Sequence, residues 1–235
     1  MISLTTIARF YSKVLNESPL AQSSRDYLYE RGFTKDTLDT FCIGYSPEPI
    51  IDYIALDALK YSDLLNLEEV KHLFKLENGA YSDRFRGRIT FPFTSSAGNV
   101  LGFAARSIGG ELPKYLNSSE STAYSKSRCL FGLSQAHESI FDSNFAILCE
   151  GYTDAMAFHQ AGKHEAVACG GTHATSYQLS LIARYTKNLL LAFDADDAGD
   201  SVTQKTLHLA TSMGFNTKIL KMDRGKDPAE SLLKG

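Results

Sequence analysis

The sequence predicts an α/β protein, in which a parallel sheet flanked by helices follows a mixed α+β N-terminal part. After residue 142, apolar segments of strand length alternate with helical segments four times, and short connections join them. This order is typical of a parallel sheet covered by helices. Before residue 142, helical periodicity comes first and strand alternation follows, which indicates a separate mixed part.

The first elements are predicted to be helices. Apolar residues recur at helical spacing over 7–15 and 21–31, and Gly32 fits the C-terminal cap of the second segment. Thr34 then caps a short third helix, and we expect two more helices over 52–75.

The pattern changes to strands after residue 84. Apolar residues alternate on either side of Gly98, which predicts a hairpin over 89–103. Residues 109–132 show little periodicity, so we expect a long polar loop there, and loops of this length are usually functional.

The alternating elements fill the C-terminal part. A last helix begins at Asp227-Pro228, because proline suits the first helical position, and its end at Gly235 leads us to expect a truncated segment. The strands and helices expected before it lie at 145–149, 154–160, 166–169, 176–185, 189–193, 199–213 and 217–221.

Composition excludes several classes of protein. With 43% apolar side chains, the 235 residues can form a core. The longest apolar stretches, such as 189–193, are far shorter than the ~18 residues of a membrane helix, and no signal peptide is visible, so we expect a soluble, intracellular protein with no membrane partner. The cysteines are single, with no C-x-x-C pair, and we expect buried thiols and no zinc.

The net charge of -3 conceals two opposite segments. Residues 84–128 carry seven basic and two acidic side chains, whereas residues 142–200 carry eight acidic and three basic ones. Basic residues interleaved with Phe and Tyr predict a groove for a phosphate backbone. The alternative is that these arginines form the solvated face of a hairpin.

Carboxylates follow two of the predicted parallel strands. Glu150 comes directly after 145–149, and Asp194 and Asp196 come after 189–193. Ligands bind at the carboxyl ends of such strands, and Asp154 shares a helix face with Glu150. Carboxylates that converge repel one another unless a cation lies between them, so the set predicts a Mg²⁺ or Mn²⁺ site. The alternative for each carboxylate is a helix cap.

A metal site beside a phosphate groove indicates phosphoryl transfer on nucleic acid. The sequence has no G-x-x-x-x-G-K-[ST], G-x-G-x-x-G or G-x-S-x-G motif. A Walker-type NTPase, a dinucleotide oxidoreductase and a serine hydrolase are therefore disfavoured.

The residues also resemble a known family. Glu150-Gly151-Tyr152-x-Asp154 with Asp194-x-Asp196 is similar to the Toprim signature of DnaG-type primases, topoisomerases and some nucleases. Nearly the whole chain resembles the RNA-polymerase core of bacterial DnaG-type primases. The segments that carry the further resemblance, in order and spacing, are 27–33, 41–45, 83–92, 102–106 and 113–118.

The resemblance implies metal-dependent, template-directed synthesis of short RNA primers from NTPs on single-stranded DNA, in the cytoplasm at the replication fork. It makes Glu150 a metal ligand or general acid/base, Asp194 and Asp196 catalytic metal ligands, and Asp154 a supporting member of the metal set. Asp227 matches a later family carboxylate that also binds metal. The residues that would contact template, primer or nucleotide are Arg84, Arg86, Arg106, Lys114, Asn117, Lys126 and Arg128.

Three parts are expected: a basic nucleic-acid- and NTP-binding subdomain over 1–142, a Toprim catalytic subdomain over 143–225, and the start of a truncated helical segment over 226–235. The family's zinc-binding domain and the domain that binds the replicative helicase have no counterpart in this sequence, which predicts weak and unselective priming. The alternatives are a Toprim nuclease or topoisomerase fragment, and a non-catalytic module that binds single-stranded DNA.

Overall fold

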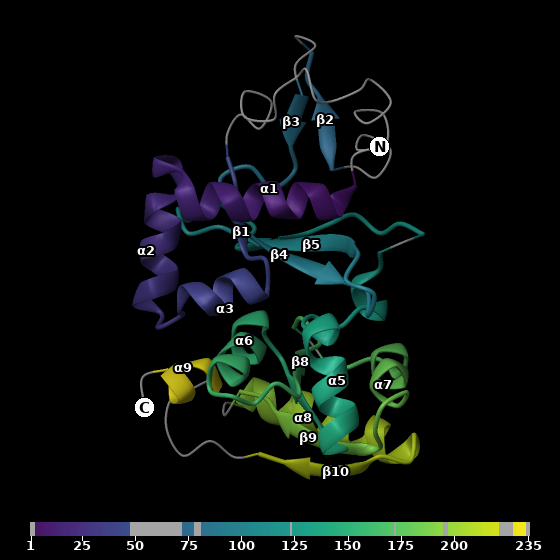
Figure 1. Cartoon of the computed structure of the whole chain (residues 1–235). Coiled ribbons are helices and arrows are strands. Elements are labelled where there is room, and N and C mark those ends of the chain that lie inside the picture. The colour runs from purple at the N-terminus through teal and green to yellow at the C-terminus, as the bar shows by residue number, and fades with distance from the viewer. Residues whose placement is uncertain are drawn as a thin grey trace. The chain divides into compact units, whose positions relative to one another are not determined.

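The computed structural model describes residues 3–47, 72–77, 81–122, 124–171, 173–194, 197–220 and 228–233 (Figure 1). The chain forms two compact units. The N-terminal unit comprises residues 1–30, 38–93 and 99–125, and the C-terminal unit comprises residues 31–37, 94–98 and 126–235. The three sequence-based domains remain a prediction. None of the helices in the described ranges is both long and apolar enough to span a membrane.

The N-terminal unit begins with the predicted helices. α1 (Leu4–Glu17) starts at Ser3, whose hydroxyl accepts the N–H of Thr6 at 3.2 Å, and its apolar face is buried. A 3-10 turn, η1 (Pro19–Ala21), leads into α2 (Gln22–Glu30), and α3 (Lys35–Thr40) follows in the chain, where residues 31–37 are assigned to the C-terminal unit. Gly32 lies between α2 and α3 with φ of 92°, as expected for a residue that ends a helix.

The sheet of this unit has the strand order β1-β4-β5-β6. The predicted hairpin corresponds to β4 and β5, which are neighbours, and α1 packs on β1 and β5 (Figure 1). A Cβ at Gly44 would overlap Tyr11, so a residue without a side chain is needed where β1 passes α1. The bounds are β1 (Gly44–Ser46), β4 (Arg88–Thr94), β5 (Val100–Arg106) and β6 (Tyr115–Asn117).

Two predictions for residues before 133 need correction. The helices expected over 52–75 lie mostly outside the described residues, but Leu73–Lys75 is strand β2, paired antiparallel with β3 (Tyr81–Asp83). The expected loop over 109–132 contains β6 and the 3-10 turn η4 (Lys126–Arg128). Three-residue strands are too short to show alternation, and pairing with another strand stabilises them.

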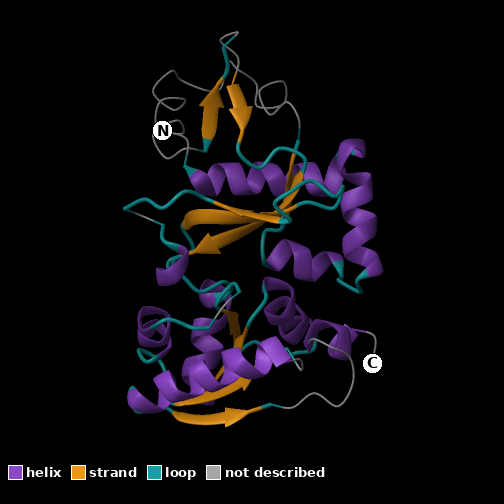
Figure 2. Cartoon of the chain, turned by 180° about the vertical axis from the view of Figure 1, so that it is seen from behind, coloured by secondary structure: helices purple, strands orange, loops and turns teal. Residues whose placement is uncertain are grey.

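The C-terminal unit contains the predicted parallel sheet, with helices packed around it (Figure 2). Its order is β10-β9-β7-β8, and every neighbouring pair is parallel, which confirms the fold class. The strands are β7 (Ala146–Cys149), β8 (Ala166–Ala168), β9 (Asn188–Ala192) and β10 (Asn216–Ile219). The helices are α5 (Leu133–Ser143), α6 (Tyr152–Gln160), α7 (Ser176–Ile182), α8 (Asp197–Ser212) and α9 (Pro228–Leu233).

The order of these strands locates the site. The chain leaves β7 for β8 on one side and then crosses to β9 on the other side of β7. The carboxyl ends of β7 and β9 therefore form the switch point of the sheet, where α/β proteins bind ligands. The core below this edge is apolar. It includes Leu148, Val167 and Leu191.

Candidate active site

Glu150 and Asp194 lie at the switch point. In the sheet register, Cys149 is paired with Ala192 of β9, so Glu150 follows β7 at the level where β9 ends, and Asp194 comes two residues after Ala192. Both carboxylates are half-buried. The structure thus brings these two predicted residues to the same edge. Asp196 and Asp227 lie outside the described residues.

A glycine pair fixes the backbone of Glu150. The N–H groups of Gly170 and Gly171, just beyond β8, donate to the carbonyl of Glu150 at 2.9 and 3.0 Å. Their φ angles are 86° and 89°, in the region that favours glycine, and a Cβ at Gly170 would lie 2.9 Å from the ring of Tyr152. Glycine is therefore needed where β8 approaches Glu150.

Asp154 occupies a different position, buried at the start of α6. One carboxylate oxygen, Oδ2, accepts the N–H of Gly151 at 3.0 Å, and Oδ1 accepts the N–H of Ala229 in α9 at 3.2 Å. The side chain therefore joins the first turns of two helices. Sequence spacing predicted its proximity to Glu150, but not the contact with α9, which is 75 residues away.

Burial and the negative charge of this edge both raise the pKa of two nearby thiols. Burial, followed by the charges of Asp154, Cys169 and Asp194, raises the pKa of Cys149 well above its usual value. Burial and then the charge of Glu150 raise the pKa of Cys169 to about 12. Cys129, Cys149 and Cys169 are buried free thiols, as predicted, whereas Cys42 is half-buried.

The donor set fits a hard divalent cation. Glu150 and Asp194 lie at the same strand edge, and carboxylate oxygens are the ligands that Mg²⁺ and Mn²⁺ prefer. Within the described part of the chain, no group of three metal-binding side chains is assembled, and this part does not include Asp196 or Asp227.

Lys126 and Arg128 belong to the same unit as the carboxylates, on the turn η4. Lys126 is half-buried and Arg128 is exposed. The guanidinium of Arg128 lies over the ring of Tyr177 in α7, at 4.6 Å from its centroid. The other predicted nucleic-acid contacts are all in the N-terminal unit.

Arg84 and Arg86 lie on the turn between β3 and β4. Arg84 donates from Nε to the carbonyl of Asn117 at 2.9 Å, which links this turn to β6. Arg86 donates from Nη1 to the carbonyl of Asp83 at 3.4 Å. Arg84 therefore has a defined position beside the predicted residue Asn117, and Arg86 is held against its own turn.

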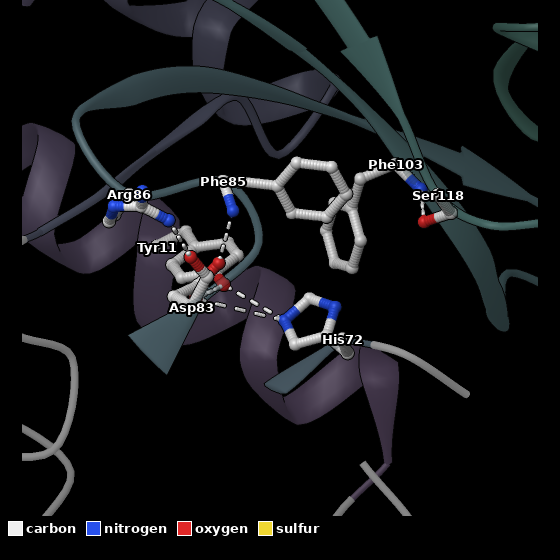
Figure 3. Close-up of polar contacts among 7 residues, drawn as sticks. All are labelled: Tyr11, His72, Asp83, Phe85, Arg86, Phe103 and Ser118. Atoms are coloured by element: carbon white, nitrogen blue, oxygen red, sulfur yellow. Dashed lines mark hydrogen bonds and ion pairs between the residues drawn. The ribbon is translucent and has the colours of Figure 1, made fainter. Parts of the chain in front are cut away.

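A buried polar cluster underlies this turn (Figure 3). The carboxylate of Asp83 accepts the N–H of Phe85 at 2.5 Å and the hydroxyl of Tyr11, whose oxygen lies 2.9 Å from Nε2 of His72. Burial lowers the pKa of His72, so its ring is neutral, and burial followed by the charge of Asp83 raises that of Tyr11. Sequence reasoning missed this cluster, because its members come from α1, from the residue before β2 and from the end of β3.

Arg106 lies between two aromatic rings. Its guanidinium carbon is 5.0 Å from the centroid of Tyr27 and 5.4 Å from that of Tyr115, and Nη1 donates to the hydroxyl of Tyr115 at 2.9 Å. Together with Lys114 it lines a cavity of about 340 Å³, a size typical of small-ligand pockets. The other lining residues are Tyr27, Ser107, Ile108, Gly110, Glu111 and Leu112.

Comparison with known proteins agrees with both units. The family model described as the DNA primase catalytic core, N-terminal domain, matches residues 10–137, and a Toprim-like model matches residues 147–232. The DNA primase of Halalkalibacterium halodurans is 34% identical over 228 residues, which cover 97% of this chain and 38% of that protein. The chain thus spans a little over a third of the length of the curated relatives it matches.

Solved structures agree as well. The zinc-binding and RNA polymerase domains of the Aquifex aeolicus primase superpose with a TM-score of 0.88 at 32% identity, covering 97% of this chain and 55% of that one. A DnaG primase catalytic domain bound to single-stranded DNA gives a TM-score of 0.82 at 31% identity, covering 97% and 74% of the two chains. The resemblance found in the sequence is confirmed.

Proposed function

Because this chain belongs to the family of DNA primase catalytic cores, we propose that it synthesises short RNA primers from ribonucleoside triphosphates on single-stranded DNA. The observation that carries the proposal is the placement of Glu150 and Asp194 at the switch point of the parallel sheet. The similarity to a primase domain bound to single-stranded DNA supports the choice of template.

The carboxylate edge would bind Mg²⁺ or Mn²⁺ through Glu150, Asp194, Asp196 and Asp227. When bound, the metal supplies positive charge that neutralises the phosphates of the reacting nucleotide. Glu150 either binds the metal or takes the proton of the primer hydroxyl. Asp154 supports this edge by ordering the starts of α6 and α9, and α9 begins directly after Asp227 in the chain.

The basic residues would hold the nucleic acid and the nucleotide. Cations bind phosphates without regard to base sequence, which suits a template groove. In the N-terminal unit the turn of Arg84 and Arg86 and the aromatic-flanked Arg106 offer such contacts, with Lys114 and Asn117 nearby in the chain. Lys126 and Arg128 would act in the C-terminal unit, where the carboxylates lie.

The place of action that follows is the cytoplasmic replication fork, with RNA primer as the product. The family's contact with a replicative helicase is made by a separate domain, and we assign it to no residue of this chain.

Ribonucleotide incorporation on single-stranded DNA tests the proposal, with Mg²⁺ or Mn²⁺ present and nicking followed in parallel. We expect incorporation without nicking, and a loss of roughly 100-fold or more in Glu150→Gln and in Asp194→Asn. Nicking without incorporation would favour a Toprim nuclease. Incorporation that survives both substitutions would refute the site.

A further inference from the structure

Gln178, in α7, is a polar side chain with only 2% of its surface exposed. Its Nε2 lies 2.8 Å from the carbonyl oxygen of Cys129, 3.1 Å from that of Cys169 and 3.2 Å from that of Lys126. Its Oε1 accepts the N–H of Thr175 at 3.0 Å. The amide nitrogen of a glutamine carries two hydrogens. The three carbonyls share these two donors, so the donor capacity of Gln178 is fully used.

These carbonyls come from two segments that are far apart in the chain. Lys126 is the first residue of the turn η4, Cys129 directly follows this turn, and Cys169 follows β8. Thr175 adds a second connection, because its hydroxyl donates to the carbonyl of Ser127 at 2.6 Å. The first turn of α7 therefore fastens η4 to the carboxyl end of β8.

The carboxyl end of β8 is in turn tied to Glu150. The N–H of Cys169 donates to the carbonyl of Cys149 at 3.1 Å, and Gly170 and Gly171 donate to the carbonyl of Glu150. Hydrogen bonds thus run without interruption from Glu150, through the segment after β8, to the side chain of Gln178 and on to η4.

α7 also orients one of the two cations on this turn. Tyr177, next to Gln178 in the chain, places its ring under the guanidinium of Arg128 at 4.6 Å. Such a contact holds the planar guanidinium while leaving its edge available to phosphate oxygens.

We propose that Gln178 is a positioning residue: its amide holds the turn of Lys126 and Arg128 near the Glu150 edge, so that these cations bind phosphate groups there. The phosphates belong to single-stranded DNA or to the incoming nucleotide. This inference rests on the function proposed above. A residue that only stabilises the fold would not change which phosphate contacts are made.

The test combines Gln178→Met with removal of the cations, as a double-mutant cycle. Labelled oligothymidylate and labelled ATP are titrated in separate arms over a series of salt concentrations. In at least one arm, we expect Gln178→Met to lower affinity about 5- to 10-fold. Its salt dependence should then become as shallow as that of Lys126→Ala/Arg128→Ala, because phosphate contacts are lost. Adding Gln178→Met to that double variant should cause no further loss.

Gln160→Met is the matched control. Gln160, in α6 of the same unit, also uses both ends of its amide: Nε2 donates to the carbonyl of Gly32, and Oε1 accepts from Thr34 and Thr37, each at 2.8 Å. Its replacement should lower stability and leave the salt dependence unchanged.

Two results would overturn the inference. One is an unchanged affinity in both arms for Gln178→Met, and the other is a loss that adds in full to that of the cation variants. If Gln178→Met does not fold, Thr175→Val is put through the same cycle and decides; it removes the bond to Ser127 and also the hydroxyl that accepts the N–H of Gln178 at the start of α7. Ribonucleotide incorporation by the unmodified chain is measured alongside. If the chain incorporates ribonucleotides and either of these two results is found, this inference fails while the proposed function stands.

Discussion

The two units place their charged side chains by different means. In the C-terminal unit, carboxylates gather because two adjacent parallel strands end at the same edge: Glu150 directly follows β7, and Asp194 comes two residues after the end of β9. In the N-terminal unit, cations lie on turns of antiparallel strands, and a buried cluster from distant segments shapes the turn of Arg84 and Arg86. Topology alone therefore positions the acidic edge, whereas the basic turn depends on long-range packing.

The largest effect on stability is expected at the edge of the parallel sheet. Asp154→Ala would leave the N–H groups of Gly151 and Ala229 without their acceptor. Because unpaired buried donors are costly, we expect a loss of about 3 kcal/mol in the free energy of unfolding. Urea denaturation measures it, with Asp200→Ala, an exposed carboxylate in α8, as the control. Equal small losses in both variants would show that Asp154 does not join the two helices.

The second effect is a pH dependence confined to the C-terminal unit. Burial lowers the pKa of His159 to about 4, and its Nε2 lies 2.9 Å from the carbonyl of Ala166. The unfolded state, with a His pKa near 6.5, binds more protons between about pH 6.5 and pH 4. Stability should therefore fall as the pH decreases through this range, by on the order of 2 to 3 kcal/mol.

His159→Gln should remove that part of the pH dependence and keep a donor to Ala166. Urea midpoints at pH 7 and pH 4.5 are compared with those of His208→Gln, which changes an exposed histidine. If the unmodified chain, His159→Gln and His208→Gln all show the same pH dependence of stability, the pH dependence does not come from His159.

In the N-terminal unit, the buried cluster is tested by Tyr11→Phe. The change removes the hydroxyl that joins Asp83 to His72, and we expect a loss of about 2 kcal/mol in the free energy of unfolding. Affinity for single-stranded DNA should also fall several-fold, since the turn of Arg84 and Arg86 loses its support. Tyr29→Phe, at an exposed tyrosine of α2, is the control. If Tyr11→Phe, under conditions where it is fully folded, binds single-stranded DNA as tightly as the unmodified chain, the cluster does not support the turn of Arg84 and Arg86.

The smallest effect is expected from a single cation of that unit. Arg106→Ala should lower affinity for single-stranded DNA about 5-fold and reduce the slope of log affinity against log salt by about 0.7, the value of one phosphate contact. Arg9→Ala, an exposed arginine of α1, should change neither quantity. Equal losses in the two variants would indicate nonspecific attraction.

The difference between features set by strand topology and features made by distant segments also explains how much of the structure the sequence predicted. The alternation after residue 142 predicted the parallel sheet, and the position of Glu150 and Asp194 after two strands predicted their common edge. α9 also begins at Pro228 as expected. Each of these predictions depends on local patterns combined with one topological rule.

Features made by distant segments could not be predicted in this way. β2 and β6 have only three residues each and are stabilised by their partner strands. Tyr11 and Asp83 are 72 residues apart, and Gln178 reaches Lys126 over 52 residues. A buried glutamine in an amphipathic helix shows no pattern of its own, because its partners are backbone carbonyls that any sequence supplies.

Mn²⁺ binding, followed by electron paramagnetic resonance, tests most directly the claim that the carboxylate edge of the C-terminal unit binds metal, separately from the cations that bind DNA. The account predicts that Glu150→Gln/Asp194→Asn binds Mn²⁺ at least roughly 10-fold more weakly than the unmodified chain, since ligands are lost. Affinity for labelled single-stranded DNA, measured with the metal chelated, should stay the same. Unchanged Mn²⁺ affinity in the double variant would contradict the placement of the metal at the carboxyl ends of β7 and β9.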